Sequence, residues 1–255
     1  MSFKFKISKT HIIVLVVVLI LIILFLLGQF SRNKHDIYLY AWERPEDFSF
    51  LTENNKTSVV FYTGSIVIEN GEAIITPRIN SLFIPKNIES IPLVRIDSFD
   101  TPRSLNNNLL EMADFIVKIC SSHKVCQIDF EARTSEYEFY SDLLENIHKS
   151  MPGTEISVTA LASWCSSENN WLNDSSASEV IPMFYRMGKD STRIKSGDVG
   201  KWFLSNPRCD KSIALSTDEL DFDSSRYTKG KSIYLFNPKS WTKESLEKAL
   251  AYLEI

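Results

Sequence analysis

Eight short segments after residue 34 alternate apolar with polar residues or form unbroken apolar runs. Each segment is seven or eight residues long, which matches the length and the pattern of a β-strand. The predicted strands are 35–42, 57–63, 91–97, 124–131, 155–162, 180–187, 211–217 and 231–237.

Between several of these strands the apolar residues recur every three or four positions, which predicts amphipathic helices at 105–122, 135–151 and 242–254. Alternating strands and helices indicate an α/β fold with a parallel sheet, and eight strands favour a closed TIM-like (β/α)8 barrel. About 220 residues are near the lower size limit of this fold, so we expect a degenerate barrel. The alternative is an open doubly wound sheet, but no glycine-rich phosphate loop follows the first strand.

The segment 65–78 departs from this alternation of strands and helices. It places Asn70-Gly71 between two runs of alternating apolar residues, which is a strong signal for a two-residue turn. We therefore predict a β-hairpin inserted after the second strand.

The start of the chain has the character of a membrane segment. An uninterrupted apolar run extends from Ile12 to Leu27, and it is about long enough to cross a bilayer as a helix. No small-x-small cleavage site follows it, so a retained signal anchor is favoured over a long signal-peptide core. Because three lysines precede the run, the bulk of the chain is expected outside. We therefore predict a single-helix transmembrane anchor at 1–34 and an extracytoplasmic domain, periplasmic or extracellular, at 35–255.

The predicted domain after the anchor is acidic. Five of the 28 basic residues and none of the 32 acidic ones precede it, so its net charge is −9. This charge argues against nucleic acid or an anionic membrane surface as the main partner. The four histidines lie at predicted peripheral or helical positions, so we expect no metal and no other cofactor.

Four cysteines are too few for a fold built on disulfides, and they lack the spacing of a metal site. Outside the cytoplasm a pair can oxidise. Cys165 and Cys209 both lie in loop-like stretches after predicted strands, so we predict a disulfide between them. Cys120 and Cys126 flank a turn from a helix into a strand, and we expect them to be core thiols.

In a TIM barrel the residues that act on a ligand collect at the carboxyl ends of the strands. Nearly every predicted strand of this chain ends on charged, polar or aromatic residues. Carboxylates interleaved with Trp and Tyr are typical of sugar sites, because aromatic faces stack on pyranose rings and acids act on the glycosidic oxygen. The candidate site residues are Trp42, Glu43, Arg95, Asp97, Asp129, Glu131, Trp164, Tyr185, Arg186, Asp218, Glu219 and Trp241.

Asp129 and Glu131 form the leading pair, because residues two apart in a strand share one face. Repulsion between neighbouring carboxylates raises a carboxyl pKa, which suits Glu131 to act as a general acid that Asp129 tunes. The alternative is structural: Asp129 pairs with Arg95 or Arg133, and Glu131 is a solvated charge at a strand end.

Adjacent residues of a strand point to opposite faces, so only one of Asp218 and Glu219 is expected to enter the barrel mouth. We prefer Glu219, as a nucleophile or base, and a turn formed by both residues is the alternative. By the same rule only one of Tyr185 and Arg186 is expected to face inward.

The remaining candidates have structural alternatives of their own. Trp42, Trp164 and Trp241 are candidates for the floor of the cleft, and core packing is the alternative for each. For Glu43 the alternative is an ion pair with Arg44 at the start of a helix.

Two of the strand ends resemble motifs of known enzymes. QIDFE at 127–131 resembles the end of the D-x-x-D-x-D-x-E signature of chitinase-type glycoside hydrolases, and MFYR at 183–186 resembles their M-x-Y-D. The resemblance implies that Glu131 is the general acid, that Asp129 assists it and that Tyr185 supports the reacting sugar.

The chain departs from these signatures at three positions. Lys124 and Gln127 replace the first two Asp of the longer signature, and Arg186 replaces the final Asp of M-x-Y-D. In the enzymes that final Asp helps to hold the N-acetyl group of the substrate, so its replacement argues against a chitin-like substrate.

A second resemblance covers almost all of the chain after residue 35. Its segments resemble those of an uncharacterised bacterial family, the domain of unknown function 3142 family: AWERPEDF, QIDFEAR, TALASWC, PMFYRMG, LSTDE and FNPKSW. This resemblance implies a glycosidase-like TIM barrel and says little about activity.

The sequence supports two hypotheses about function. The first is a membrane-anchored glycoside hydrolase that acts on an envelope or extracellular polysaccharide, with Glu131 as the acid and Glu219, or the substrate itself, in the second role. The second is a non-catalytic carbohydrate-binding or scaffold barrel of the cell envelope, a pseudoenzyme that the altered signature positions favour. Both predict a carbohydrate partner, a membrane contact through the N-terminal helix and no nucleic acid, and both leave the oligomeric state open.

Overall fold

The computed structural model of the protein describes residues 36–53, 56–165, 171–188, 191, 206–220 and 228–255. Within these ranges no helix is both long enough and apolar enough to cross a membrane. The predicted anchor at 1–34 lies outside the described residues.

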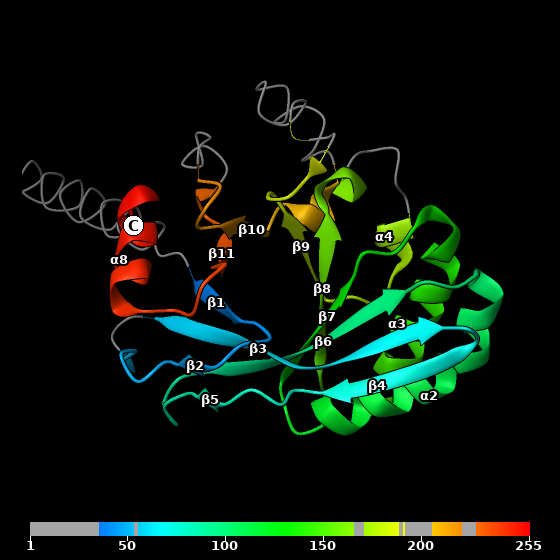
Figure 1. Ribbon diagram of the computed structural model, residues 1–255. Helices are drawn as coiled ribbons and strands as arrows, with labels where there is room; N and C mark the ends of the chain where they lie inside the picture. Colours follow the sequence, from blue (N-terminus) through cyan, green and yellow to red (C-terminus); the bar gives the residue numbers. More distant parts are fainter. Residues whose placement is uncertain (1–35, 54–55, 166–170, 189–190, 192–205, 221–227) are drawn as a thin grey trace, which may run out of the picture. The chain divides into compact units, whose positions relative to one another are not determined.

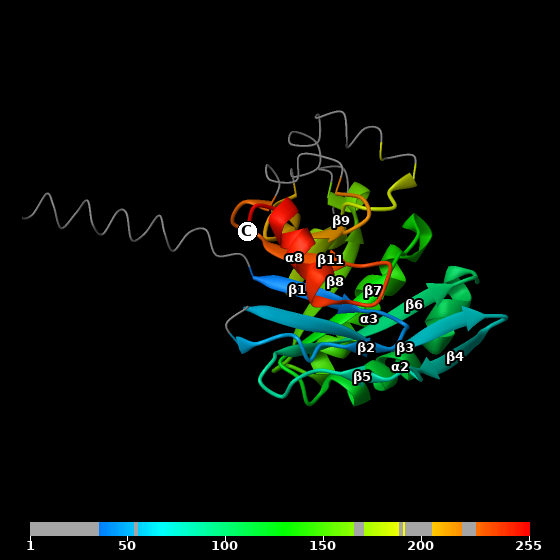
Figure 2. The same cartoon turned by 60° about the vertical axis from the view of Figure 1, so that its left-hand side comes forward.

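Eight parallel strands close into a barrel (Figures 1 and 2). Their order around the barrel follows the order in the chain, and β1 pairs with both β3 and β11, which closes the ring. The prediction of eight strands and a TIM-like barrel is therefore confirmed. The strands are β1 (Ile37–Ala41), β3 (Thr57–Glu69), β6 (Ser90–Ser98), β7 (Val125–Phe130), β8 (Glu155–Leu161), β9 (Glu179–Met183), β10 (Ser212–Ser216) and β11 (Ser232–Phe236).

Alternation along the strands separates two apolar cores. One core contains strand residues only, and these fill the inside of the barrel: Tyr40, Val60, Tyr62, Ile91, Leu93, Ile181, Met183, Ala214 and Tyr234. The larger core lies between the outer faces of the strands and the helices, where Ile128 and Phe130 meet Phe139 and Leu143. The side chains at the carboxyl ends of the strands therefore stand on a filled barrel.

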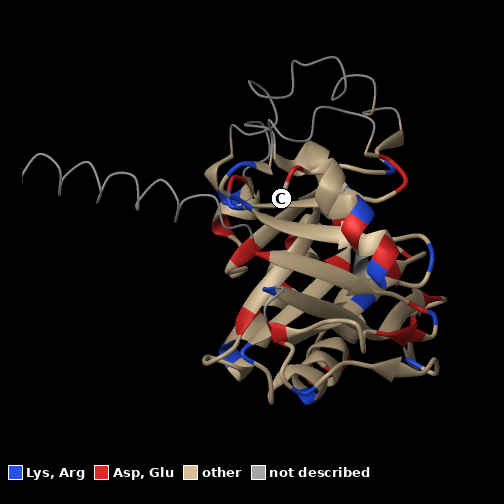
Figure 3. Cartoon of the chain, turned by 90° about the vertical axis from the view of Figure 1, so that its left-hand side faces the viewer, with Lys and Arg blue, Asp and Glu red and all other residues tan. Residues whose placement is uncertain are grey.

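The three predicted helices are present as α2 (Pro102–Cys120), α3 (Tyr137–Ser150) and α8 (Lys243–Tyr252). α2 and α3 pack side by side, and α8 lies on the other side of the barrel (Figure 1). α8 begins at Thr242, whose side chain accepts a hydrogen bond from the backbone N–H of Ser245. Its exposed Lys and Glu residues, blue and red in Figure 3, form ion pairs one turn apart, Lys243 with Glu247 and Glu244 with Lys248. A short helix α4 (Trp171–Asp174) and the 3-10 turns η2 (Thr134–Glu136), η3 (Ala162–Cys165) and η7 (Pro207–Cys209) are also present.

The predicted hairpin is present, but it continues the second barrel strand instead of following it. β3 extends beyond the barrel and pairs antiparallel with β4 (Glu72–Pro77). Asn70 and Gly71 form the turn with positive φ angles of 54° and 82°, as a type I′ turn requires. A second small sheet joins β2 (Glu46–Asp47) to β5 (Leu82–Phe83).

Two disulfides are present. Cys165 in η3 is joined to Cys209 in η7. The expectation of core thiols at Cys120 and Cys126 was wrong, because these residues are joined as well. The tight turn between α2 and β7 brings their Cα atoms to 5.5 Å, which suits a disulfide.

The two disulfides are expected to contribute unequally to stability, because a cross-link that closes a longer loop restricts the unfolded chain more. The sequence separations are 44 residues for Cys165–Cys209 and 6 for Cys120–Cys126. Replacing both cysteines of a pair by Ala should lower the free energy of unfolding by about 4 kcal/mol for the long loop and about 2 kcal/mol for the short one. Urea unfolding followed by circular dichroism measures both losses, and equal losses would contradict the prediction.

Candidate functional site

A cavity of about 330 Å³ opens at the carboxyl ends of the barrel strands. This is the end at which TIM barrels carry their active sites. Residues from β1, β6, β7, β8, β9 and β11 or their following loops line it: Tyr40, Trp42, Arg95, Asp129, Glu131, Thr159, Leu161, Ala162, Ser163, Met183, Tyr185, Arg186, Met187 and Phe236.

The cavity brings together half of the residues that the sequence predicts for the site. Six of the twelve candidates line it: Trp42, Arg95, Asp129, Glu131, Tyr185 and Arg186. Three more, Asp97, Asp218 and Glu219, form ion pairs with an arginine of the lining but do not line the cavity themselves. Glu43, Trp164 and Trp241 lie elsewhere.

Asp129 is held on the inner face of β7 near the bottom of the cavity. The hydroxyl of Thr159 on the neighbouring strand β8 donates a hydrogen bond of 2.5 Å to its Oδ1 atom. Burial raises the pKa of Asp129 to about 6; the Thr159 hydrogen bond opposes this rise, and the charge of Glu131 adds to it. Asp129 therefore exchanges its proton close to neutral pH.

Glu131 follows the last residue of β7 and is exposed at the mouth of the cavity, one step further out than Asp129. Both carboxyl groups line the same cavity, as expected for residues two apart along one strand. The sequence predicted a raised pKa for the outer carboxyl, whereas the structure assigns a raised pKa to Asp129, because Asp129 is the more deeply buried of the two.

Arg95 on β6 faces the cavity beside these carboxyl groups. It forms an ion pair of 2.9 Å with Asp97, and its guanidinium lies 5.8 Å from the ring centre of Trp42. Among the described residues Asp129 has no ion pair with Arg95, although the positive charge of Arg95 lowers its pKa. Arg133 pairs with Glu136 at 3.8 Å. The structural alternative, an ion pair of Asp129 with Arg95 or Arg133, is therefore wrong for these described residues.

Aromatic rings form one wall of the cavity. The ring of Tyr185 stacks on Phe236 at 5.6 Å with an interplanar angle of 6°, and Trp42 meets Phe236 edge to face at 6.4 Å. Burial, followed by the charges of Asp129 and Glu131, raises the pKa of Tyr185, so its hydroxyl stays protonated and can donate a hydrogen bond. Flat rings beside acids suit a ring-shaped, hydroxyl-rich ligand.

Both Tyr185 and Arg186 line the cavity, so the prediction that only one of them faces inward was wrong. The regular strand β9 ends at Met183, and alternation applies only within a strand. Arg186 adopts a positive φ of 52°, which turns its side chain back over Phe236, with 5.4 Å between guanidinium and ring centre.

Arg186 also binds the two acidic residues that follow β10. The Oε2 atom of Glu219 accepts a hydrogen bond of 3.0 Å from the backbone N–H of Arg186, and its Oε1 atom lies 3.9 Å from the guanidinium. Asp218 lies 3.6 Å from the same guanidinium and accepts a hydrogen bond from Ser216. Both acids point to Arg186, so neither enters the cavity as the sequence predicted for one of them.

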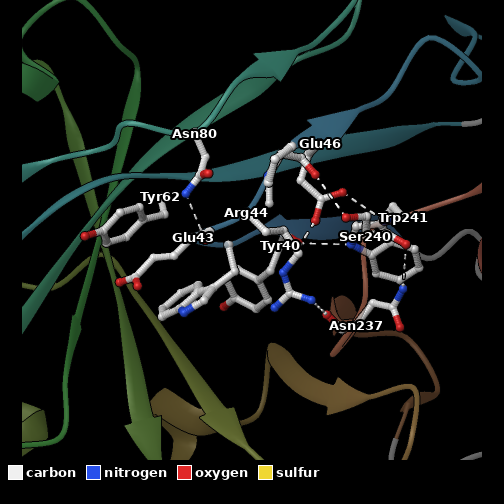
Figure 4. A network of polar contacts seen from close by, with 12 residues as sticks. Tyr40, Glu43, Arg44, Glu46, Tyr62, Asn80, Asn237, Ser240 and Trp241 are labelled. Atoms are coloured by element: carbon white, nitrogen blue, oxygen red, sulfur yellow. Dashed lines mark hydrogen bonds and ion pairs between the residues drawn. The ribbon is translucent and has the colours of Figure 1, made fainter.

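Trp164 and Trp241 are buried in the core and do not form the floor that the sequence predicts. Trp164 packs against Tyr137 and Trp171 on the outside of the barrel. Trp241 donates its indole N–H to the carbonyl of Tyr40 at 3.0 Å (Figure 4). Both lie beyond the end of a regular strand, where the face of a side chain no longer follows from its position in the sequence.

Glu43 is exposed and points toward Tyr62 instead of the cavity (Figure 4). A helix does not start here, because Pro45 leads into β2. Arg44 pairs with Glu46 at 3.9 Å instead of with Glu43. The alternative for Glu43, an ion pair with Arg44 at a helix start, is therefore wrong as well.

Sequence reasoning missed several lining residues. Thr159, Met183 and Phe236 are examples, and each lies within or at the end of a strand. The signal was available, because Thr159 precedes Leu161 by two positions and Met183 precedes Tyr185 by two. The apolar character of Met183 and Phe236 made them resemble ordinary core residues.

Replacing Thr159 by Val is expected to raise the pKa of Asp129 above about 6, because it removes the hydrogen bond that stabilises the carboxylate. Carbon-13 NMR titration of labelled Asp carboxyl groups measures this change in pKa. Thr76→Val, on the exposed strand β4, is the matched control and should leave the titration unchanged. An unchanged pKa of Asp129 in Thr159→Val would show that the hydrogen bond does not act on the carboxyl group.

Comparison with known proteins shows a similarity of fold. No protein-family model matches the chain, so the resemblance to the domain of unknown function 3142 family is not confirmed, and no curated protein matches it. A fungal endo-β-N-acetylglucosaminidase from glycosyl hydrolase family 18 is similar in structure, with a TM-score of 0.54 and 12% identity over 85% of this chain and 96% of that one.

Two further structures are more distant. They are an endo-β-N-acetylglucosaminidase from Cordyceps militaris (TM-score 0.44, 10% identity, 89% and 94% of the two chains) and the Legionella pneumophila ChiA C-terminal domain (0.47, 10%, 86% and 96%). With its TM-score above 0.5, the first likeness shows that the described chain shares the barrel fold of a family 18 glycosidase.

Proposed function

We propose that the chain is a glycoside hydrolase-like protein that acts on an envelope or extracellular polysaccharide. The observation that carries the proposal is the pair of Asp129 and Glu131 in one cavity at the carboxyl end of the barrel, beside an aromatic wall. Glycoside cleavage needs an acid at the glycosidic oxygen and a second carboxylate or a substrate group at the anomeric carbon, and aromatic rings bind the sugar by stacking on its ring.

In the proposed reaction Glu131 gives its proton to the glycosidic oxygen. The bond between that oxygen and the anomeric carbon breaks, and its electron pair leaves with the oxygen. The Asp129 carboxylate, or a neighbouring group of the substrate, stabilises the positive charge that develops on the sugar. A water molecule then adds to the anomeric carbon and returns a proton to Glu131, which restores the acid.

Asp129 and Tyr185 have supporting roles in this scheme. Asp129 gains and loses its proton near pH 6, so its charge state tunes the acid beside it. Tyr185 keeps its proton and is placed to donate a hydrogen bond to a sugar oxygen. Arg95 and Arg186 are proposed to bind the hydroxyl or other oxygen substituents of the same glycan.

The proposal includes the location that the sequence predicts. The signal anchor at 1–34 would hold the domain at 35–255 on the outer side of the membrane. A polysaccharide of the envelope or of the extracellular medium is then the glycan within reach.

The second candidate function is a carbohydrate-binding barrel without catalysis. It is favoured by Arg186, which binds Glu219 outside the cavity lining. The carboxyl groups in the cavity then come from a single strand end, whereas two-carboxylate glycosidases place them on both sides of the bond.

Glycan-array binding of the protein, followed by product analysis on each glycan that binds, tests the proposal. Cleavage with new reducing ends supports a hydrolase. Binding without products would favour the non-catalytic barrel, and a chain that binds no glycan would contradict both.

A further inference from the structure

The hairpin brings a single arginine, Arg78, back to the carboxyl end of the barrel. β4 ends at Pro77, which pairs with Gly64 on β3, and the backbone N–H of Arg78 donates to the carbonyl of Thr63 at 2.8 Å. A Cβ atom at Gly64 would lie 2.7 Å from the carbonyl oxygen of Thr76, so only glycine allows this close return. The side chain of Arg78 is thereby placed beside the loop that follows β1.

Arg78 and Asn80 bind four consecutive carbonyls, that of the last residue of β1 and those of the first three residues of the loop. The guanidinium of Arg78 donates to the carbonyl oxygens of Ala41, at the end of β1, at 3.1 Å, and of the loop residues Trp42, at 2.7 Å, and Arg44. The side-chain amide of Asn80 donates to the remaining carbonyl, that of Glu43, at 3.1 Å (Figure 4). Four consecutive carbonyls, 41–44, are therefore held by two side chains from the end of the hairpin.

The guanidinium of Arg78 donates hydrogen bonds to backbone carbonyls. Arg78 is half-buried, and in the described part of the chain it has no carboxylate within 4 Å. Two further bonds, to the carbonyls of Tyr62 at 3.3 Å and Asn80 at 3.0 Å, fix the planar fork at both ends. A lysine ammonium cannot reproduce this geometry, because its donors radiate from one atom.

The loop that Arg78 holds carries part of the cavity wall. Trp42 lines the cavity and meets Phe236 edge to face. Arg44 donates to the carbonyl of Asn237 at 3.2 Å (Figure 4). Its guanidinium lies 6.0 Å from the ring centre of Phe236. Residues 42–45 lie between β1 and β2 and form no strand of their own. The direction of the Trp42 side chain therefore depends on how the backbone of this loop is held.

We infer that Arg78 is a positioning residue of the candidate site. By holding the carbonyls of Ala41, Trp42 and Arg44 it fixes Trp42 in the cavity wall, and through Trp42 it sets the affinity for the glycan. The effect on Trp42 stands independently, and only the effect on the glycan rests on the proposed function.

The test compares Arg78→Lys and Arg78→Met with a matched control, Arg208→Lys, in the full chain. Arg208 is also half-buried and also donates to backbone carbonyls, those of Ser175 and Ala177, but it does not line the cavity. The fluorescence of Trp42 is isolated in each background by subtracting the spectrum of the same protein with Trp42→Phe. Both Arg78 variants should shift this emission to longer wavelength and make it easier to quench with acrylamide, whereas Arg208→Lys should leave it unchanged.

Asn80→Ala removes only the contact to Glu43, so it should change the Trp42 emission in the same direction by a smaller amount. If the Arg78 variants do not fold, this variant tests whether the contacts to carbonyls 41–44 position Trp42. An unchanged Trp42 signal in Arg78→Lys, or an equal change in Arg208→Lys, would overturn the inference. On a glycan identified by array, Arg78→Lys should raise KM by about tenfold and change kcat less. If the wild type binds no glycan, the proposed function fails, while the Trp42 signal still decides the role of Arg78.

Discussion

Glu131→Gln is expected to slow glycan cleavage by about 10²- to 10⁴-fold, the usual contribution of a general acid. Gln has the shape of Glu but cannot give a proton to the glycosidic oxygen. Because Glu131 is exposed at the cavity mouth, the substitution should leave folding unchanged. The loss should therefore appear in kcat, with the binding of the glycan retained.

Initial rates of reducing-end release, together with isothermal titration of the same glycan, separate the two effects. Glu138→Gln, on the exposed face of α3, is the matched control and should keep the wild-type rate. Glu219→Gln distinguishes the two schemes for the second carboxylate: an equally large loss would return Glu219 to the role that the sequence predicts. Cleavage by Glu131→Gln at the wild-type rate would end the hydrolase proposal in its present form.

The barrel could be predicted because period-two alternation is a property of the strand itself. Each of the eight strands carries its pattern locally, and Asn70-Gly71 specifies the hairpin turn without help from the rest of the chain. The same alternation predicts which side chains of a strand point into the cavity, as it does for Arg95 and Asp129.

Prediction failed where the strands end. Arg186 faces the cavity because its φ is positive, and the sequence contains no sign of this at a residue other than Gly or Asn. Glu219 does not line the cavity, and its carboxyl group binds Arg186, which is a contact between residues 33 positions apart. Trp164 and Trp241 were uncertain for a similar reason, since tertiary packing decides whether a loop tryptophan enters a core.

The raised pKa of Asp129 depends on how deeply its side chain is buried, and the alternation of residues along a strand does not predict that depth. Asp129 and Glu131 share a face, but Asp129 lies one strand step deeper in the barrel and accepts the Thr159 hydroxyl, whereas Glu131 is in contact with solvent. Burial is the largest cause of the raised pKa of Asp129. The sequence therefore identified the pair but not the depth at which Asp129 lies.

Asp129→Asn is expected to stabilise the protein at neutral and alkaline pH. In the folded protein the pKa of Asp129 is about 6, above the ordinary value of about 3.9 in an unfolded chain. The folded state therefore binds this proton more tightly, so the contribution of Asp129 to stability is greatest below about pH 4 and falls as the pH rises through about 6. A pKa difference of one between the folded and unfolded chain corresponds to about 1.4 kcal/mol, so ionised Asp129 costs about 3 kcal/mol above pH 7.

An uncharged Asn removes this cost, and the variant should lose the fall in stability between about pH 4 and 6 that Asp129 causes in the wild type. Urea unfolding of both proteins at a series of pH values measures the difference, with Asp142→Asn on the exposed face of α3 as the control. Parallel curves for the wild type and Asp129→Asn would mean that Asp129 does not carry the raised pKa.

The same substitution should lower glycan cleavage, because Asn can neither tune Glu131 nor stabilise positive charge on the sugar. Greater stability together with lower activity is the signature of a group retained for chemistry and not for folding. A variant that is both more stable and fully active would instead make Asp129 a dispensable charge of the barrel, and the stabilisation of positive charge on the sugar would then fall to a neighbouring group of the substrate.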